Sequence, residues 1–332
     1  MASIILPQKW RTPERQITPE SVYHNRREFL KVLGVAGMGI AGAFYTSPAW
    51  SATRFFNLDD FFEEKELRTD FQKIDNLKRN AAYTVKRPIS DEEGALTYNN
   101  FYEFTSVKDG VWKLVEQFKP RPWQLEITGH VENAAVYEID DLIRSMPIEE
   151  RVYRHRCVER WAMVVPWNGF SMKALIDKVR PTHKAKYVRF VSFLDPEVAP
   201  GQKNNSRLPW PYTEGLTLAE AMNELTFLST GIYGHMQPAQ HGAPIRLVTP
   251  WKYGYKSIKS ITRIEFVETQ PSTFWNTLVP HEYGFVSNVD PDTPHPRWSQ
   301  KFEKMIGTGE VYPTQKFNGY GEWVSSLYAS TP

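Results

Sequence analysis

The chain has 332 residues, of which 41% are hydrophobic and 23% charged, and this composition excludes a disordered tail and a protein with several membrane spans. Lys and Arg number 40 against 38 Asp and Glu, so no strong net charge directs the protein toward nucleic acid or an anionic membrane. The single cysteine, Cys157, excludes an intramolecular disulfide, a four-cysteine zinc site and an iron–sulfur cluster held by four thiolates of this chain.

The N-terminal segment has the pattern of an export signal. Arg26 and Arg27 precede an uncharged stretch at 32–45 that contains several glycines. This stretch is too short to span a membrane, and paired arginines before it are typical of the twin-arginine route. We expect residues 1–51 to be a cleaved twin-arginine signal peptide and residues 52–332 to be the mature chain in the periplasm. Because this route exports folded proteins, often with a cofactor already inserted, it favours a cofactor. The alternative, an amphipathic helix of the fold, would need a polar face that the stretch lacks.

The mature chain shows more strand patterns than helix patterns. Mixed spacings of three and four at 57–80 predict an amphipathic surface helix. Thr217 and Glu220 form a capping-box pattern. In chain order, the remaining patterns predict a strand at 123–131, a helix at 139–146, a strand at 151–157, a helix at 171–179, a strand at 187–193, a helix at 217–226, and strands at 245–251 and 261–268.

The irregular order of these elements predicts an α+β fold, a mixed β-rich single domain, and argues against a doubly wound sheet. No Gly/Ser-rich linker divides residues 52–332. The segment 271–296 contains five prolines, which predicts a long ordered loop of the kind that covers a functional site.

Cys157 is the first candidate for chemistry. Arg154, Arg156 and Arg160 surround it in the sequence, and their charges favour the thiolate. A protease nucleophile is poorly supported, because His155 lies two residues away on the same strand face. A buried thiol and a soft-metal ligand, with a cofactor supplying the other ligands, both remain open.

A second candidate lies at 242–260. Arg246, Lys252, Lys256 and Lys259, together with glycines and the backbone N–H groups around Ser257, are typical of a phosphate site. The alternatives are a strand edge protected by lysines and, less compatible with a neutral exported protein, a nucleic-acid surface.

These stretches resemble a known family when read together. The matching motifs are Tyr-Asn-Asn-Phe-Tyr-Glu-Phe at 98–104, Arg-Cys-Val-Glu at 156–159, Met-Val-Val-Pro-Trp at 163–167, Gly-Ala-Pro-Ile-Arg-Leu at 242–247, Pro-Trp-Lys-Tyr-Gly at 250–254, Ile-Lys-Ser at 258–260, Glu-Tyr-Gly-Phe at 282–285 and His-Pro-Arg-Trp-Ser-Gln at 295–300. In these motifs, their order and the leader, the chain resembles the bacterial periplasmic protein-methionine-sulfoxide reductase catalytic subunits, which are molybdopterin enzymes of the sulfite-oxidase fold.

The resemblance implies a molybdenum–molybdopterin cofactor with one pterin per chain. It implies that Cys157 ligates the metal as a catalytic residue and that Glu159 and Arg160 shape the substrate pocket, with Glu159 the second catalytic candidate. Ser192 stands where the family has Thr, and His241 stands where it has Asn. The implied pterin-binding residues are Asn99, Tyr102, Glu103, Ser192, His241, Arg246, Ser257, Ile258 and Lys259.

The implied activity is the reduction of methionine sulfoxide in periplasmic proteins by oxygen-atom transfer. Because the chain has no haem-attachment motif, electrons are expected from the quinone pool through a membrane haem-binding subunit. A monomeric catalytic subunit without a nucleic-acid partner is expected, since dimeric relatives use an added domain. The alternatives are the same cofactor acting on small S-oxides, N-oxides or sulfite, and a non-enzymatic periplasmic binding protein in which Cys157 is merely buried.

Overall fold

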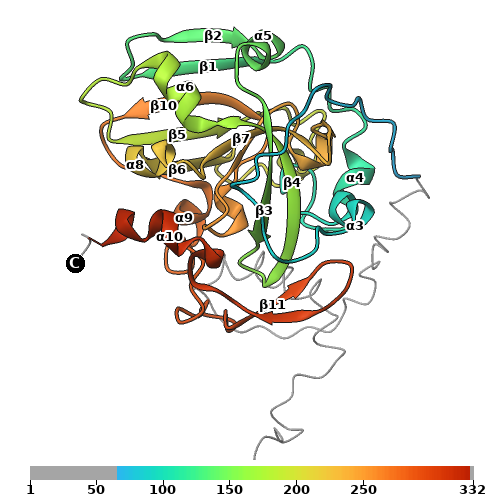
Figure 1. Cartoon of the computed structure of the whole chain (residues 1–332). Helices are drawn as coiled ribbons and strands as arrows, with labels where there is room; N and C mark the ends of the chain where they lie inside the picture. The colour runs from blue at the N-terminus through green and yellow to red at the C-terminus, as the bar shows by residue number, and fades with distance from the viewer. Residues whose placement is uncertain (1–65, 330–332) are drawn as a thin grey trace, which may run out of the picture. The chain divides into compact units, whose positions relative to one another are not determined.

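Two mixed β-sheets form the framework of the chain that this computed structural model describes, residues 66–329 (Figure 1). The first sheet has the order β2-β1-β10-β5-β6. Its strands are β1 (Gln124–Gly129), β2 (Ala135–Glu138), β5 (Tyr187–Ser192), β6 (Thr213–Thr217) and β10 (Ile261–Val267). β1 and β10 run parallel, whereas the other neighbours are antiparallel.

The second sheet has the order β12-β11-β4-β7-β8, with β3 paired to β4 and β9 paired to β7. Its strands are β3 (Glu149–Arg156), β4 (Trp161–Ser171), β7 (Phe227–Ile232), β8 (His235–Met236), β9 (Arg246–Val248), β11 (Phe302–Met305) and β12 (Val311–Pro313). In Figure 1 the long β3–β4 hairpin descends from the first sheet toward β11, which pairs with the start of β4.

The helices of residues 66–329 are short, and the longest, α6, has eight residues. They are α3 (Glu92–Thr97), α4 (Val111–Leu114), α5 (Ile139–Arg144), α6 (Met172–Val179), α7 (Pro200–Asn204), α8 (Leu218–Met222), α9 (Phe274–Leu278), α10 (Gly321–Val324), and the 3-10 turns η3 (Ala239–His241), η4 (Gly254–Lys256), η5 (Lys316–Gly319) and η6 (Ser325–Tyr328). None of them is long and apolar enough to cross a membrane. Because the described residues belong to one compact unit rich in strands, the predicted α+β class is confirmed. The predicted signal peptide lies outside the described residues.

Two helices, α6 and α8, begin at the residues where capping side chains in the sequence predict them to begin. The hydroxyl of Ser171 accepts a hydrogen bond from the backbone of Lys173 and caps α6. Thr217 and Glu220 form the predicted capping box of α8. α8 ends at Met222, earlier than predicted, because the next residue has extended backbone.

The predicted N-terminal surface helix is absent from the part of that segment that the structure describes. Residues 66–80 form no helix, so the prediction is wrong there. Phe71 instead stacks on His235 with ring centroids 4.8 Å apart, and Arg79 pairs with Glu150 through an isolated β-bridge. The apolar side chains of this segment are therefore half-buried one at a time against distant residues, although their spacing suits a helix.

The long strand β4 was not predicted as a separate element. Ten of its eleven residues are buried, so it lacks the alternation that marks a half-exposed strand. At Gly169 the register with β7 shifts, and a Cβ there would lie 2.1 Å from the carbonyl oxygen of Leu228. Only glycine permits this approach.

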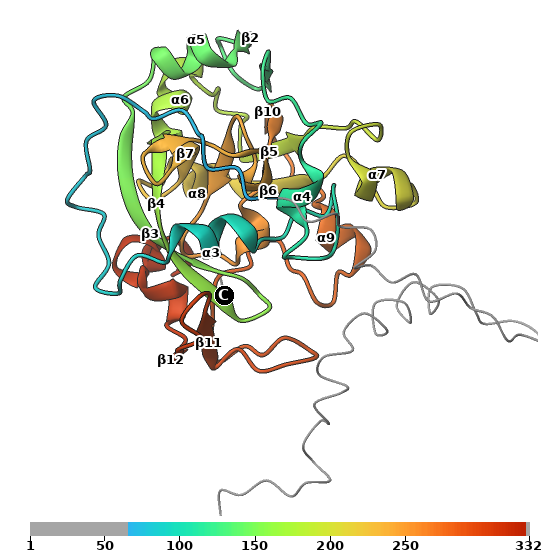
Figure 2. The same cartoon turned by 90° about the vertical axis from the view of Figure 1, so that its right-hand side faces the viewer.

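A cluster of phenylalanines positions the loop that precedes the functional site. Phe101, Phe104, Phe118 and Phe193 are buried against one another. They hold the segment between α3 and α4, which lie close together in both Figure 1 and Figure 2. The backbone of residues 99–103 is thereby fixed without regular secondary structure.

Candidate active site

A cavity that opens to solvent lies at the tip of the β3–β4 hairpin. Among the residues predicted from the sequence, those that line it are Asn99, Tyr102, Glu103, Cys157, Glu159, His241, Arg246, Ser257, Ile258 and Lys259. Tyr102 and Glu159 are half-buried, so the mouth of the cavity reaches solvent. The structure therefore brings together every predicted site residue except Ser192 and the exposed Arg160.

Ser192 lies behind the cavity wall. Its hydroxyl donates a hydrogen bond to the carbonyl of Lys259 at 2.8 Å. The side chain holds the backbone of Lys259 in place and also hydrogen-bonds the carboxyl of Glu103, which lines the cavity, whereas Ser192 itself is not part of the lining.

Cys157 is the first residue of the turn between β3 and β4. Its N–H donates to the carbonyl of Trp161, and the N–H of Glu159 donates to its Sγ at 3.4 Å. Burial and the charge of Glu159 raise the pKa of the thiol well above its usual value, although Lys108 and Arg156 act in the opposite direction. Arg156 thus favours the thiolate, as expected from its charge, but burial and Glu159 outweigh this effect in the chain without a metal. A metal ion would have to displace this proton.

Glu159 stands beside the thiol as an anchored carboxylate. Its Oε2 lies 3.7 Å from Cys157 Sγ and accepts hydrogen bonds from Trp161 Nε1 at 3.1 Å and Asn100 Nδ2 at 3.2 Å, while its Oε1 pairs with Lys108 at 3.0 Å. Burial acts to raise the pKa of Glu159, but Lys108 and these hydrogen bonds outweigh it and lower the pKa below its usual value. No motif in the sequence points to Lys108, whereas Asn100 belongs to the Tyr-Asn-Asn-Phe-Tyr-Glu-Phe motif at 98–104.

Two cations line the cavity without forming a salt bridge in the described part of the chain, Arg246 and Lys259. Lys259 Nζ donates to Asn99 Oδ1 at 3.1 Å and to the carbonyls of Asn100 and Gln240, both at 2.8 Å. Burial lowers the pKa of Arg246 to about 9. Burial and the charge of Arg246 lower the pKa of Lys259 well below its usual value. An anion in the cavity would offset this penalty.

The other two lysines of this segment are not part of the cavity. Lys252 pairs with Glu220 at 2.5 Å and Lys256 pairs with Glu214 at 2.6 Å, and all four side chains are buried. The prediction of a phosphate site that includes Lys252 and Lys256 is therefore wrong, and only Lys259 of the three lysines faces the cavity.

Several polar groups of the cavity wall lack a partner among residues 66–329. They include the buried atoms Asn99 Nδ2, Asn100 Oδ1 and Trp167 Nε1. The backbone N–H groups of Ile258 and Lys259 also donate to no described residue. Because buried polar groups are normally hydrogen-bonded, these groups point to a ligand. Donors, an acceptor and two cations suit a polar heterocycle that carries a phosphate, so the residues present fit a molybdopterin.

His241 is held as a neutral imidazole. Burial and the charges of Lys259 and Arg246 keep its pKa well below the usual value. Its Nε2 lies 2.9 Å from the carbonyl of Ala95 and must therefore carry the proton, which leaves Nδ1 as an acceptor. The histidine thus offers one donor and one acceptor, as an asparagine would.

Sequence reasoning missed an aromatic part of the wall. Tyr255, Trp275 and Tyr283 line the cavity, and the last two come from the proline-rich segment 271–296. The prediction that this segment contributes to the site is confirmed. Tyr283 lay inside the recognised Glu-Tyr-Gly-Phe motif, which was the available signal. His155 also lines the cavity, and burial with Arg246 and Lys259 lowers its pKa to about 3.

Comparison with known proteins agrees with this geometry. Residues 112–275 match the family described as "Oxidoreductase molybdopterin binding domain". Over 327 residues the chain is 44% identical to the protein-methionine-sulfoxide reductase catalytic subunit MsrP of Burkholderia mallei (strain ATCC 23344), an alignment that covers 95% of this chain and 92% of that protein. The chain belongs to the MsrP family. It is an enzyme with a molybdopterin-binding oxidoreductase domain, as predicted.

The cavity of this MsrP family member extends beyond the matched domain. Cys157, Arg246 and Lys259 lie inside 112–275, whereas Asn99 and Tyr283 lie outside it. Among solved structures, the sulfane dehydrogenase SoxCD from Paracoccus pantotrophus matches with 12% identity and a TM-score of 0.40, over 68% of this chain and 56% of that chain. This likeness is too weak to add to the argument.

Proposed function

We propose that the protein reduces methionine sulfoxide in periplasmic proteins by oxygen-atom transfer, using one molybdenum–molybdopterin per chain. The observation that carries this proposal is the position of Cys157, whose thiol lies in the turn at the mouth of a cavity with two cations in its wall. The name of the relative from Burkholderia mallei supports the substrate.

The cofactor would be held by groups from distant parts of the chain. When bound, molybdenum–molybdopterin supplies the two-electron chemistry needed to remove an oxygen atom from a sulfoxide. Cys157 would ligate the metal, and Arg246 with Lys259 would attract the phosphate. Asn99 Nδ2 and the N–H groups of Ile258 and Lys259 would bind the polar atoms of the pterin.

The aromatic wall suits the side chain of an oxidised methionine. Tyr102 and Trp275 have ring centroids 5.0 Å apart, and Trp275 and Tyr283 are 5.1 Å apart. Such rings interact favourably with a polarizable sulfur and its methyl group. Because Tyr102 and Trp275 are half-buried at the mouth, a methionine sulfoxide on a polypeptide could enter there.

Glu159 would handle protons at this mouth. Reduction of a sulfoxide consumes two protons and two electrons and releases a thioether and water. The carboxylate of Glu159 is ionised, lies 3.7 Å from Cys157 Sγ and is half-buried. Its Oε2 would accept a proton from solvent and pass it to the sulfoxide oxygen of the substrate, which leaves as water.

The twin-arginine pattern supports a periplasmic location for residues 52–332. The relative is named a catalytic subunit, which supports a separate electron donor. We infer that this donor is a membrane haem-binding subunit fed by the quinone pool, and that the catalytic subunit is monomeric.

An assay with a reduced viologen dye tests this function. Purified protein from a host that makes molybdopterin would receive a methionine-oxidised protein, free methionine sulfoxide, dimethyl sulfoxide or an N-oxide. Sulfite would be tested separately, with an oxidised dye as the electron acceptor in place of the reduced one. We expect kcat/KM for the oxidised protein to exceed that for the small substrates by about tenfold or more, and Cys157→Ser to lose about a hundredfold or more.

Three outcomes contradict the proposal. Turnover of small S-oxides, N-oxides or sulfite without turnover of oxidised protein would assign the alternative substrate class. A protein that binds molybdenum but reduces nothing would remove the oxygen-transfer role. A folded chain without molybdenum would favour the non-enzymatic binding protein, in which Cys157→Ala has only a packing cost.

A further inference from the structure

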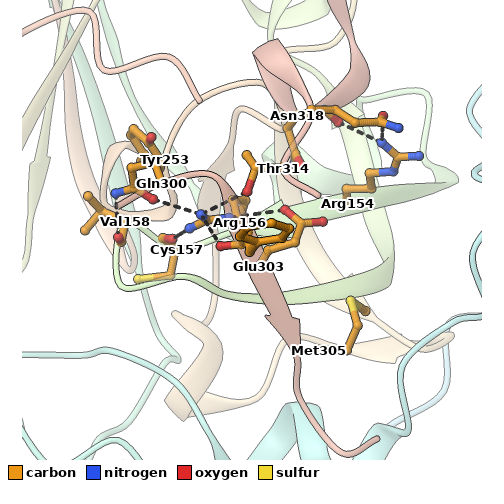
Figure 3. Close-up of polar contacts among 12 residues, drawn as sticks. Arg154, Arg156, Cys157, Val158, Tyr253, Gln300, Glu303, Met305, Thr314 and Asn318 are labelled. Carbon is orange, nitrogen blue, oxygen red and sulfur yellow. Dashed lines mark hydrogen bonds and ion pairs between the residues drawn. The ribbon is translucent and has the colours of Figure 1, made fainter. Parts of the chain in front are cut away.

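Arg156 is a fully buried residue directly before Cys157. As Figure 3 shows, its guanidinium lies between the turn of the β3–β4 hairpin and the C-terminal segment. It donates to the carbonyl of Cys157, to Gln300 Oε1 at 2.8 Å and to Glu303 Oε2 at 3.2 Å. Arg156 and Glu303 are both almost without exposed surface. One side chain therefore joins the backbone of Cys157 to β11 and to the residue two positions before that strand.

The same C-terminal segment holds the rest of the turn. The carbonyl of Val158 accepts hydrogen bonds from Trp298 Nε1 and Gln300 Nε2, both at 2.8 Å. The N–H of Lys304 donates to the carbonyl of Arg160 at 2.8 Å. The turn carrying the thiol is thus fixed by residues that do not line the cavity and that lie outside the matched domain, 112–275.

We infer that Arg156, Gln300 and Glu303 act as positioning residues that set the direction in which the Cys157 sulfur points into the cavity. This inference rests on the proposed role of Cys157 as the metal ligand. The direction of Sγ depends on the orientation of the Cys157 backbone. A planar guanidinium with several fixed N–H groups constrains that orientation better than a flexible ammonium does. Partners behind a metal ligand commonly tune the site in this way.

Arg154 provides a matched control. It lies two residues earlier on β3, so its side chain leaves the strand on the same face. Its guanidinium also reaches the C-terminal segment, where it contacts Gln315 and donates to the carbonyl of Asn318 at 3.3 Å (Figure 3). It makes no contact with the carbonyls of residues 157–160. Like Arg156→Met, Arg154→Met removes one positive charge and side-chain contacts with the C-terminal segment, but it leaves the contacts of the turn that carries Cys157 unchanged.

The test compares molybdenum content, the sulfur-to-molybdenum absorption bands and the electron paramagnetic resonance of the one-electron-reduced state in the holoenzyme. We expect Arg156→Met and Arg156→Lys to retain metal, to shift both spectra and to lower kcat by about tenfold to a hundredfold. Arg154→Met is expected to keep wild-type spectra. Lysine should fail to rescue because one ammonium cannot reach all the partners of Arg156.

Gln300→Met supplies a second variant if the Arg156 variants do not fold, because it removes the bridge to Val158 while leaving Arg156 in place. The inference is overturned if Arg156→Met keeps wild-type spectra. If Arg156→Met does not fold, wild-type spectra in Gln300→Met overturn it instead. Spectral shifts in Arg154→Met as large as those in Arg156→Met would also overturn it. The Cys157→Ser variant shows whether only the positioning inference has failed or whether the proposed function has failed as well. If that variant also keeps wild-type spectra, Cys157 is not the ligand and both proposals fall.

Discussion

At the residue scale, the cationic side chains in the cavity wall differ from two buried lysines nearby in whether a carboxylate pairs with them. Lys252 and Lys256 are each matched by a carboxylate at 2.5 and 2.6 Å. Arg246 and Lys259 have no such match among the described residues and donate to carbonyl and amide oxygens. Since an unmatched buried charge is costly, these two residues mark the place where an external anion stabilises the fold.

Glu103 gives a pH-dependent prediction at this scale. Its pKa rises from 4.5 to about 7, mainly through burial, so the folded chain binds this proton more tightly than the unfolded chain does. The free energy of unfolding of the cofactor-free chain should therefore fall by roughly 3 kcal/mol through this group as pH rises from about 4.5 to about 7.

Urea titrations of the cofactor-free chain at several pH values check this expectation. Glu103→Gln cannot ionise, so its stability relative to wild type should increase across that pH interval by the same amount. A difference that stays constant from acid to neutral pH would show that Glu103 has an ordinary carboxyl pKa.

At the element scale, the close approach of η4 to β3 shapes the cavity. A Cβ on Gly254, the first residue of η4, would lie 2.8 Å from His155 Nε2. His155 is flanked by the indoles of Trp161 and Trp167 and lines the cavity, so we expect its ring to move toward the cavity. We expect Gly254→Ala to displace the imidazole and to lower the molybdenum content of the purified protein severalfold.

A double substitution makes this prediction specific. His155→Ser should restore space, so Gly254→Ala with His155→Ser should bind more molybdenum than Gly254→Ala alone. Gly284→Ala is the control, because no atom lies within 4 Å of a Cβ at Gly284. Equal metal content in the Gly254 and Gly284 variants would contradict the steric argument.

What could be predicted about the elements depended on how local their signals are. The starts of α6 and α8 are set by side chains within three residues of the cap, and the sequence predicts both. β4 is uniformly buried because it pairs with β3, β7 and β11, and this environment erases the alternation that identifies strands. The residues at 66–80 have helical spacing but pack singly against distant residues, and no local signal reveals that.

At the whole-molecule scale, one hydroxyl of the C-terminal turn η6 joins that turn to α8 and to the loop that follows β9. Tyr328 donates to Glu220 Oε1 at 2.7 Å and lies 3.1 Å from Lys252 Nζ and 2.8 Å from Trp251 Nε1, both of which donate to it. Tyr328→Phe leaves the indole N–H of the buried Trp251 without this partner. We expect the free energy of unfolding to fall by about 1–3 kcal/mol.

Urea unfolding of the cofactor-free chain measures this loss. Tyr312→Phe is the control, because its hydroxyl contacts only the exposed carboxylate of Glu310 among described residues, and its effect should stay within about 0.5 kcal/mol. If the two variants lose the same free energy of unfolding, the buried hydrogen bonds of Tyr328 do not contribute to stability.

The candidate site shows the same division between local and distant signals. Motif resemblance placed Cys157, Arg246 and Lys259 in one pocket, and the structure brings them together. The resemblance named only Lys259 of the three lysines, whereas the lysine pattern at 242–260 could not separate Lys259 from Lys252, since only the fold puts Glu220 beside the latter. Nor could the resemblance place Ser192 behind the wall, because that depends on the fold around the end of β5.

The distribution of the site along the chain fixes an order of events in time. The cavity wall includes Asn99 near the start of the described chain, Lys259, which donates a hydrogen bond to Asn99, and Tyr283. Trp298 and Gln300 hold the turn of Cys157 through the carbonyl of Val158. The full wall of this cavity forms only after the chain up to Tyr283 has been made, and the turn of Cys157 is held only after residue 300 has folded back. We therefore expect the cofactor to be acquired after synthesis has passed this point, and a nascent chain that stops short of it to offer an incomplete pocket.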